Sequence, residues 1–448
     1  MMPASDTLSP PDVRPVAITP AIAGDRPATD AQAVLQPWLR AQAMNVTRHA
    51  AALRPFRRAE FGNGPAAPSD GHIKVVNDLI ARLRRGLLHL SKRATKSAAA
   101  AASQPVSARL ERLVVDKDRA HFWVQGIEKI WDFYLELFGQ RQSQYGDWLL
   151  ACDRIALDCY QVTYTRLGTA RSIPAPPPFS YMRTGFGPAT FRRHIPLTRL
   201  GKQLNPFPLV QLPYHRLVNP WTLGAVLHEV SHNLQSDLGL SRAVPRTVAR
   251  KLLDGGMGPK VASVWTRWNR EMFADMSGLL LGGPSVVGSL MDVVGRKPSV
   301  VYKFSGKVPH PTPYLRTLVS VELLRRIGFE REAEQYRRAW LRMYPNPRAG
   351  NIPDAILKTF PEACAIAVDA MCFEPFASLG NKCLSQVIKF EPKDQAMVEE
   401  AAQRISAGVD PGIIPERFLI AASRVALDRR LARPGVVAEN FFKELIRK

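Results

Sequence analysis

The segment that most constrains this chain of 448 residues is NPWTLGAVLHEVSHNLQSDLGLS, residues 219–241. Asn219 is a good helix N-cap residue and Pro220 suits the first helical position. Gly239 can end the helix in a left-handed conformation. We therefore expect one buried helix over residues 220–238. Its apolar stripe follows helical spacing and consists of Leu223, Val226, Leu227, Val230 and Leu234.

Two histidines of this segment, His228 and His232, lie four residues apart. Positions four apart share one face of a helix, with Cβ atoms about 5–6 Å apart, so two imidazole nitrogens can reach one ion at about 2.0–2.1 Å. Glu229 points about 100° around the axis. It is poorly placed to bind the same ion, but it can act as a general base on a water beside that ion. The alternative is a buried helix whose histidines only form hydrogen bonds to the backbone.

A third ligand is expected from WNREMFADMSGLLLGGP, residues 268–284, where Glu271 and Asp275 are four apart on a predicted helix. Gly278 lies on the same face. Glycine inside a helix costs about 1 kcal/mol relative to alanine unless a close approach to another helix offsets it. We expect Glu271 to complete the ligand set of one catalytic Zn²⁺, with Asp275 orienting a ligand histidine. The alternative is an exposed acidic face in a basic segment.

A third element, HPTPYLR at residues 310–316, follows the two helices. HEVSH, then E-x-x-x-D, then HP-x4-R together resemble the gluzincin metallopeptidases, and most of all the HtpX and CAAX-prenyl-protease type. The resemblance covers about residues 215–325, a quarter of the chain. It implies zinc-dependent hydrolysis of peptide bonds. Those enzymes are embedded in membranes, whereas we find no convincing membrane span in this sequence.

His310 and Arg316 are the candidates for stabilising negative charge in the reaction. Peptide hydrolysis builds charge on the carbonyl oxygen, and neither of the two predicted helices supplies a donor for it. Arg316 is expected in the first turn of a following helix, where it can also hold the acidic residues in place. His310 is therefore the preferred direct donor. The alternative is a loop histidine and an arginine that pairs with a nearby acid.

The charge balance suggests an acidic partner. Lys and Arg exceed Asp and Glu by 61 to 39, giving a formal charge of +22. Residues 73–97 predict a basic amphipathic helix, so the basic N-terminal region could bind nucleic acid or an anionic surface. The alternatives are a solvated surface and a helix packed on its own domain. Five irregularly spaced cysteines fit reduced thiols. With neither a secretory signal nor a span visible, we expect a cytoplasmic protein, and export by a specialised route stays open.

The predicted fold is mainly α with a small α+β gluzincin-like catalytic core. Residues 206–218 read as an irregular strand, and their prolines would confine it to the edge of a short sheet over the HExxH helix. Such an edge could hold a substrate peptide by strand addition. The predicted regions are a largely disordered segment at 1–70 with a short helix at 30–46, a basic amphipathic helix and linker at 71–107, the catalytic domain at 108–345 and a helical region at 346–448.

The predicted function is that of a zinc metalloendopeptidase acting on a protein or peptide, with Glu229 as general base. The alternative is a non-catalytic basic protein that binds nucleic acid or an anionic surface and carries a structural or degenerate metal site. Glu229 discriminates between the two, because a closed structural site needs no base.

Overall fold

A computed structural model describes residues 29–168, 172–185, 187–196 and 203–448. It is mainly helical with small sheets, which confirms the predicted fold class. The chain forms two compact units that divide inside two long helices. The first unit joins residues up to 52 with residues 86–124, and the second joins 53–85 with 125–448. The boundaries predicted for the catalytic domain stay a prediction.

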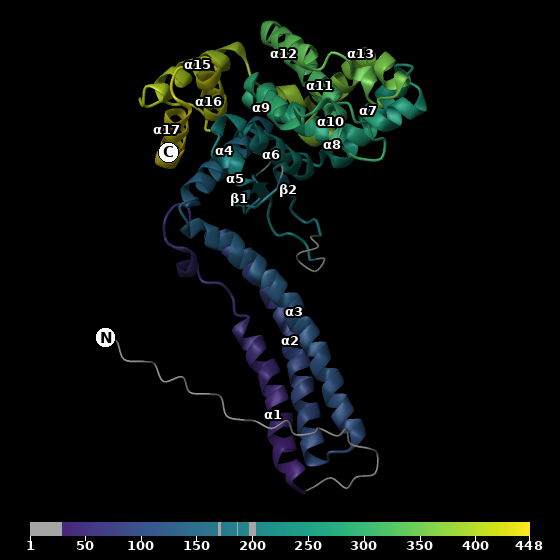
Figure 1. Cartoon of the computed structure of the whole chain (residues 1–448), viewed down its shortest axis with the longest axis vertical. Coiled ribbons are helices and arrows are strands. Elements are labelled where there is room, and N and C mark those ends of the chain that lie inside the picture. The colour runs from purple at the N-terminus through teal and green to yellow at the C-terminus, as the bar shows by residue number, and fades with distance from the viewer. Residues whose placement is uncertain (1–28, 169–171, 186, 197–202) are drawn as a thin grey trace, which may run out of the picture. The chain divides into compact units, whose positions relative to one another are not determined.

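Helices dominate both units (Figure 1). They are α1 (Thr29–Ala52), α2 (Asp70–Ser103), α3 (Ser107–Gly139), α4 (Gly146–Leu167), α5 (Tyr214–Leu217), α6 (Gly224–Asp237), α7 (Leu240–Asp254), α8 (Pro259–Gly282), α9 (Ser285–Val294), α10 (Pro298–Val301), α11 (Pro313–Arg326), α12 (Glu330–Met343), α13 (Asp354–Val368), α14 (Leu384–Val387), α15 (Pro392–Ser406), α16 (Phe418–Asp428) and α17 (Pro434–Arg447). A π-helical turn, Asp369–Phe373, follows α13.

The first unit packs α1 against the C-terminal part of α2 and the N-terminal part of α3. Helix α2 continues through the alanine run to Ser103, so most of the expected linker at 97–107 is helical. Alanine has the highest helix propensity, which explains the difference. Helix α1 is longer than the short helix predicted near its position, and the disorder predicted for residues 1–28 lies outside the described residues. The core of the unit consists of Leu39, Ala43, Ala98, Ala101 and Leu113.

The centre of the second unit is the packing of α6 against α8, with α4 and α7 also in contact with this pair. The apolar stretch 276–294 forms the end of α8, a turn and α9. Among the described residues, no helix has both the length and the apolar character needed to cross a membrane.

The sheet beside α6 has three strands in the order β1 (Phe179–Met182), β3 (Leu209–Leu212), β2 (Ala189–Phe191). Strand β3 pairs parallel with β1 and antiparallel with β2, so it is the central strand. The prediction that residues 206–218 form an edge strand is therefore wrong. Pro208 and Pro213 flank the four paired residues and leave the ladder intact. A second, two-stranded sheet pairs β4 (Pro375–Phe376) with β5 (Lys382–Cys383).

The helix that carries the two histidines begins later than predicted. A 3₁₀ turn occupies Pro220–Thr222, and the α-helix itself starts at Gly224. The Asn219 side chain does not cap α6 and instead donates a hydrogen bond to the carbonyl of His215. The other end agrees with the prediction, because Gly239 has a φ of 73°.

Candidate metal centre

Three segments of the second unit bring the predicted site residues together. Helix α6 carries His228, Glu229 and His232, helix α8 carries Glu271 and Asp275, and the start of α11 with the loop before it carries Arg316 and His310. The backbones of α6 and α8 meet at Gly278. A Cβ atom there would lie 3.4 Å from the backbone nitrogen of His228, so alanine would just fit and a larger side chain would not. The close approach inferred from this glycine is confirmed.

His228, His232 and Glu271 each offer one donor atom, and these three atoms lie within 4.8 Å of one another. The two Nε2 atoms are 3.1 Å apart; that of His228 lies 3.5 Å from Oε2 of Glu271, and that of His232 lies 3.5 Å from the other carboxylate oxygen, Oε1. Donors held at about 2.0–2.1 Å by one tetrahedral ion lie about 3.3 Å from each other. The three measured separations bracket this value. Two imidazoles and a carboxylate are also ordinary zinc ligands, so the donor set fits a zinc ion in both chemistry and spacing.

Asp275 contacts the ring nitrogen of His228 that faces away from the other donors, and Arg316 binds Asp275. The Nδ1 of His228 lies 2.8 Å from Oδ1 of Asp275, which leaves its Nε2 directed at Glu271. Arg316 donates to both oxygens of Asp275, at 2.5 Å from Nε and 2.8 Å from Nη2. A ligand histidine commonly donates its other ring N–H to a carboxylate, and that bond fixes its orientation. Asp275 therefore contacts the ring nitrogen of His228 that an orienting carboxylate would bind, and its role stays a prediction.

The charges of the cluster favour a cation at this point. Burial lowers the pKa of His228, but the carboxylates of Asp275 and Glu271 together outweigh burial and raise that pKa to about 10. Burial, followed by the charge of His228, lowers the pKa of His232 to about 3. Burial raises the pKa of Glu271, yet the hydrogen bond with His228 holds it below its usual range. The carboxylates that stabilise a proton on His228 would stabilise a bound metal ion in the same way.

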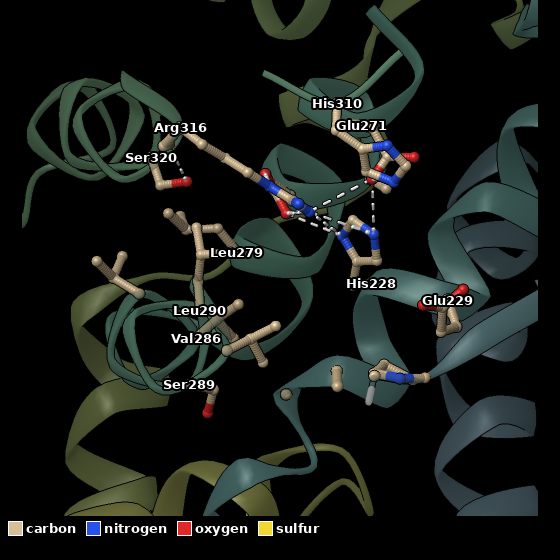
Figure 2. Close-up of a pocket in the computed structure, with 18 residues that line it drawn as sticks. His228, Glu229, Glu271, Leu279, Val286, Ser289, Leu290, His310, Arg316 and Ser320 are labelled. Atoms are coloured by element: carbon tan, nitrogen blue, oxygen red, sulfur yellow. Dashed lines mark hydrogen bonds and ion pairs between the residues drawn. The ribbon is translucent and has the colours of Figure 1, made fainter. Parts of the chain in front are cut away.

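Glu229 follows His228 on α6, and these two residues line one cavity together with Glu271. It is buried, and burial raises its pKa to about 7. Figure 2 shows its carboxylate set apart from the group formed by Glu271, His310 and Arg316. A carboxylate with a pKa near neutrality can both accept and release a proton.

His310 faces the same cavity as Glu229, as the sequence predicts. Its Nε2 lies 3.5 Å from Oε2 of Glu271, and 62% of its side chain is exposed. Figure 2 shows the rings of His310 and His228 on either side of the Glu271 carboxylate. The side chain is therefore placed to meet a molecule that enters the cavity, and its role stays a prediction.

The cavity has a volume of about 270 Å³ and an apolar wall that the sequence analysis missed. Its side opposite the histidines is contributed mainly by α9, and Figure 2 shows Leu279, Val286 and Leu290 grouped there. Gly187 and Pro188, which precede β2, line another side. The spacing of Val286, Leu290 and Val293 on one helical face could have revealed this wall, but the same pattern also describes an ordinary core face.

Comparison of the chain with models of known families, with curated proteins and with solved structures gave no match. The gluzincin resemblance thus stays an expectation based on three short motifs. What can be said of the site rests on the geometry of its residues.

Proposed function

We propose that this protein is a zinc-dependent peptidase, with one ion held by His228, His232 and Glu271. One observation carries the proposal. The two imidazoles of α6 and the Glu271 carboxylate of α8 lie at distances that suit one tetrahedral ion, and His228 and Glu271 line a cavity together with the buried carboxylate of Glu229.

Zinc in such a site lowers the pKa of water and polarises a carbonyl group. Glu229 accepts a proton from the water that attacks the scissile carbonyl carbon. As the C–N bond breaks, Glu229 delivers this proton to the leaving amine nitrogen. The near-neutral pKa of Glu229 suits both transfers.

His310 and Arg316 have different tasks in this proposal. The exposed ring of His310 donates a hydrogen bond to the carbonyl oxygen as negative charge develops there. Arg316 is a positioning residue, because its guanidinium is already bonded to Asp275, which in turn orients His228.

A peptide is the substrate class that fits the surroundings of the cavity. Strand β2 is an edge strand, and a hydrogen bond from Asn233 Nδ2 to Thr190 Oγ1, 2.7 Å long, joins it to α6 one residue beyond His232. The segment before β2 lines the cavity. An extended peptide paired with β2 would place one side chain against the apolar wall of α9. In this proposal the edge strand that binds the peptide is β2, and not residues 206–218 as the sequence predicts.

The test combines metal analysis with digestion of a denatured protein mixture. Wild-type protein should hold one zinc per chain and cleave the mixture. Glu229→Gln should hold the same zinc and lose cleavage by about 100- to 10,000-fold, because it removes the base and keeps the ligands. His232→Ala should lose the zinc together with the activity.

Two outcomes would count against the peptidase. Equal cleavage by wild type and Glu229→Gln at equal zinc content would remove Glu229 from the chemistry. Tightly bound zinc with no cleavage of any protein mixture would favour the non-catalytic binding protein with a structural site.

A further inference from the structure

For its size, the first unit exposes more large apolar side chains than the second. Nine of the twenty exposed large apolar side chains in the described chain belong to it, although it holds less than a sixth of the described residues. Scattered exposed apolar residues are normal, but a concentration of them marks an interaction site. The nine are Val34, Trp38, Met44, Leu88, Val106, Val114, Val115, Phe122 and Trp123.

The most exposed apolar stripe lies on the outer side of α3. Phe122 is 79% exposed and Val115 is 50% exposed, and seven residues separate them, so both project from one face. Arg119 lies between them on this face and is also exposed. The buried side of α3 is a different face, which includes Leu113 and Ala120. Neighbouring Trp38 of α1 is 46% exposed and has the Lys117 ammonium 5.9 Å from its ring centre.

The same unit is basic. Residues 33–52 and 86–124 contain nine Lys and Arg residues and three Asp and Glu residues. One of the three acids, Asp116, is buried, and Arg93 donates to it at 2.6 Å. In α1 from residue 33 onward and in the 86–103 part of α2, no acidic residue occurs. The other two acids, Glu111 and Asp118, are exposed on α3 itself, beside the exposed cations Arg112 and Arg119, so the positive surplus comes from the unit as a whole.

We propose that this unit docks on an anionic lipid surface, with Phe122 and Val115 of α3 entering the interfacial region and nearby cations meeting the lipid phosphates. Aromatic and aliphatic side chains flanked by Lys and Arg are the combination that anionic bilayers bind. Nucleic acid would use the cations but gains little from exposed valines and methionine. A second copy is disfavoured, because each chain has a formal charge of +22. The inference does not depend on the proposed peptidase activity.

The experiment uses the full chain and sedimentation with vesicles. Vesicles of phosphatidylcholine with 30% phosphatidylserine should bind the protein, and vesicles of phosphatidylcholine alone should bind it at least about tenfold more weakly. The double substitution F122S/V115T should reduce binding by at least about tenfold, since it removes the inserted side chains. Arg119→Gln should reduce binding about fivefold, and added salt should weaken it further.

Matched controls come from the second unit. Ile413→Ser removes a fully exposed apolar side chain, and Arg348→Gln removes an exposed cation; both should leave binding unchanged. Because Phe122 and Val115 are exposed, their replacement should not unfold the chain, which circular dichroism checks. The proposal fails if anionic vesicles bind no protein at low salt, or if F122S/V115T binds as wild type does. It also fails if these residues instead mediate binding of an oligonucleotide or dimerisation.

Discussion

The pair of Arg417 with Asp158 and the pair of Arg316 with Asp275 both lie largely buried in the second unit, but their remaining hydrogen bonds differ. Arg417 donates from Nη1 to both oxygens of Asp158 at 2.9 Å and from Nε to the carbonyl of Leu281 at 3.0 Å. Its backbone N–H also donates to Asp158, and its guanidinium lies 4.5 Å from the ring centre of Phe418. This pair ties α4, α8 and α16 together, and its hydrogen bonds are made inside the protein.

The pair of Arg316 and Asp275 opens onto a cavity instead. Asp275 bonds His228 as well as Arg316, while Arg316 lies 3.5 Å from Glu271 and lines the cavity. The comparison shows that burial of charge does not by itself indicate function. Charged groups indicate a site when they converge on a space that a ligand can enter.

The largest expected effect is on the stability of the protein, and it involves the pair of Arg417 and Asp158. Arg417→Met leaves the Asp158 carboxylate buried without its partner, and should lower the free energy of unfolding by about 3–5 kcal/mol. Adding Asp158→Asn should recover part of the loss. Urea denaturation measures both, and metal analysis of the folded fraction should show unchanged zinc. Zinc loss from a folded Arg417→Met protein would mean that the two pairs are coupled.

The next largest effect is on catalysis and concerns His310, the exposed side chain at the cavity. His310→Ala should lower kcat by about 100- to 1,000-fold, because it removes a donor to the developing oxyanion. KM and zinc content should stay close to wild type, as expected when only transition-state contacts are lost. His89→Ala, which removes an exposed histidine of α2, is the matched control. A raised KM with an unchanged kcat would instead assign His310 to ground-state binding.

Removal of the Asp275 carboxylate should have a smaller effect, which is on the affinity for zinc. Asp275→Asn should weaken zinc binding about 10- to 100-fold, because the His228 ring is then held less well and is a weaker base. Competition with a chromophoric chelator measures the affinity. Asp292→Asn is the control, since Asp292 pairs with Arg424 and not with a site histidine. Unchanged zinc affinity in Asp275→Asn would mean that the pair of Asp275 and Arg316, like the pair of Asp158 and Arg417, only stabilises the fold.

The smallest effect is on the pH dependence of stability. It concerns a buried histidine whose hydrogen bonds, like those of Arg417, are made inside the protein. His72 is buried, with Nδ1 2.7 Å from the Ser69 hydroxyl and Nε2 3.0 Å from the carbonyl of Pro177, and burial lowers its pKa to about 4. The unfolded state therefore binds the proton more tightly. The stabilisation is complete above pH 6.5 and is lost as the pH falls towards 4, by about 2 kcal/mol between pH 7.5 and 5. His72→Gln should reduce the acid sensitivity of urea denaturation by this amount. If the two proteins share one pH profile, His72 is not the group responsible.

The site was more predictable from sequence than the sheet was. Two residues four apart on a helix share a face whatever surrounds the helix, so HEVSH and the Glu271–Asp275 pair could be placed from spacing alone. Gly278 supplied the one non-local clue, that the two helices meet closely. The place of β3 depends on residues 179–182 and 189–191, which are distant in sequence, and nothing in residues 209–212 reveals that both sides are paired. The boundaries between the two units also lie inside α2 and α3. Because the helical pattern of the sequence continues across them, the sequence does not reveal these boundaries.

The contact at Gly278 has a mechanical consequence for the candidate metal centre. Because backbone meets backbone there, main-chain packing sets the distance between the two helices that carry the histidines and Glu271. Close-packed interiors have low compressibility and transmit strain rather than absorb it. The spacing of the three donors should therefore change little under hydrostatic pressure. It should be lost only when α6 and α8 separate as whole helices.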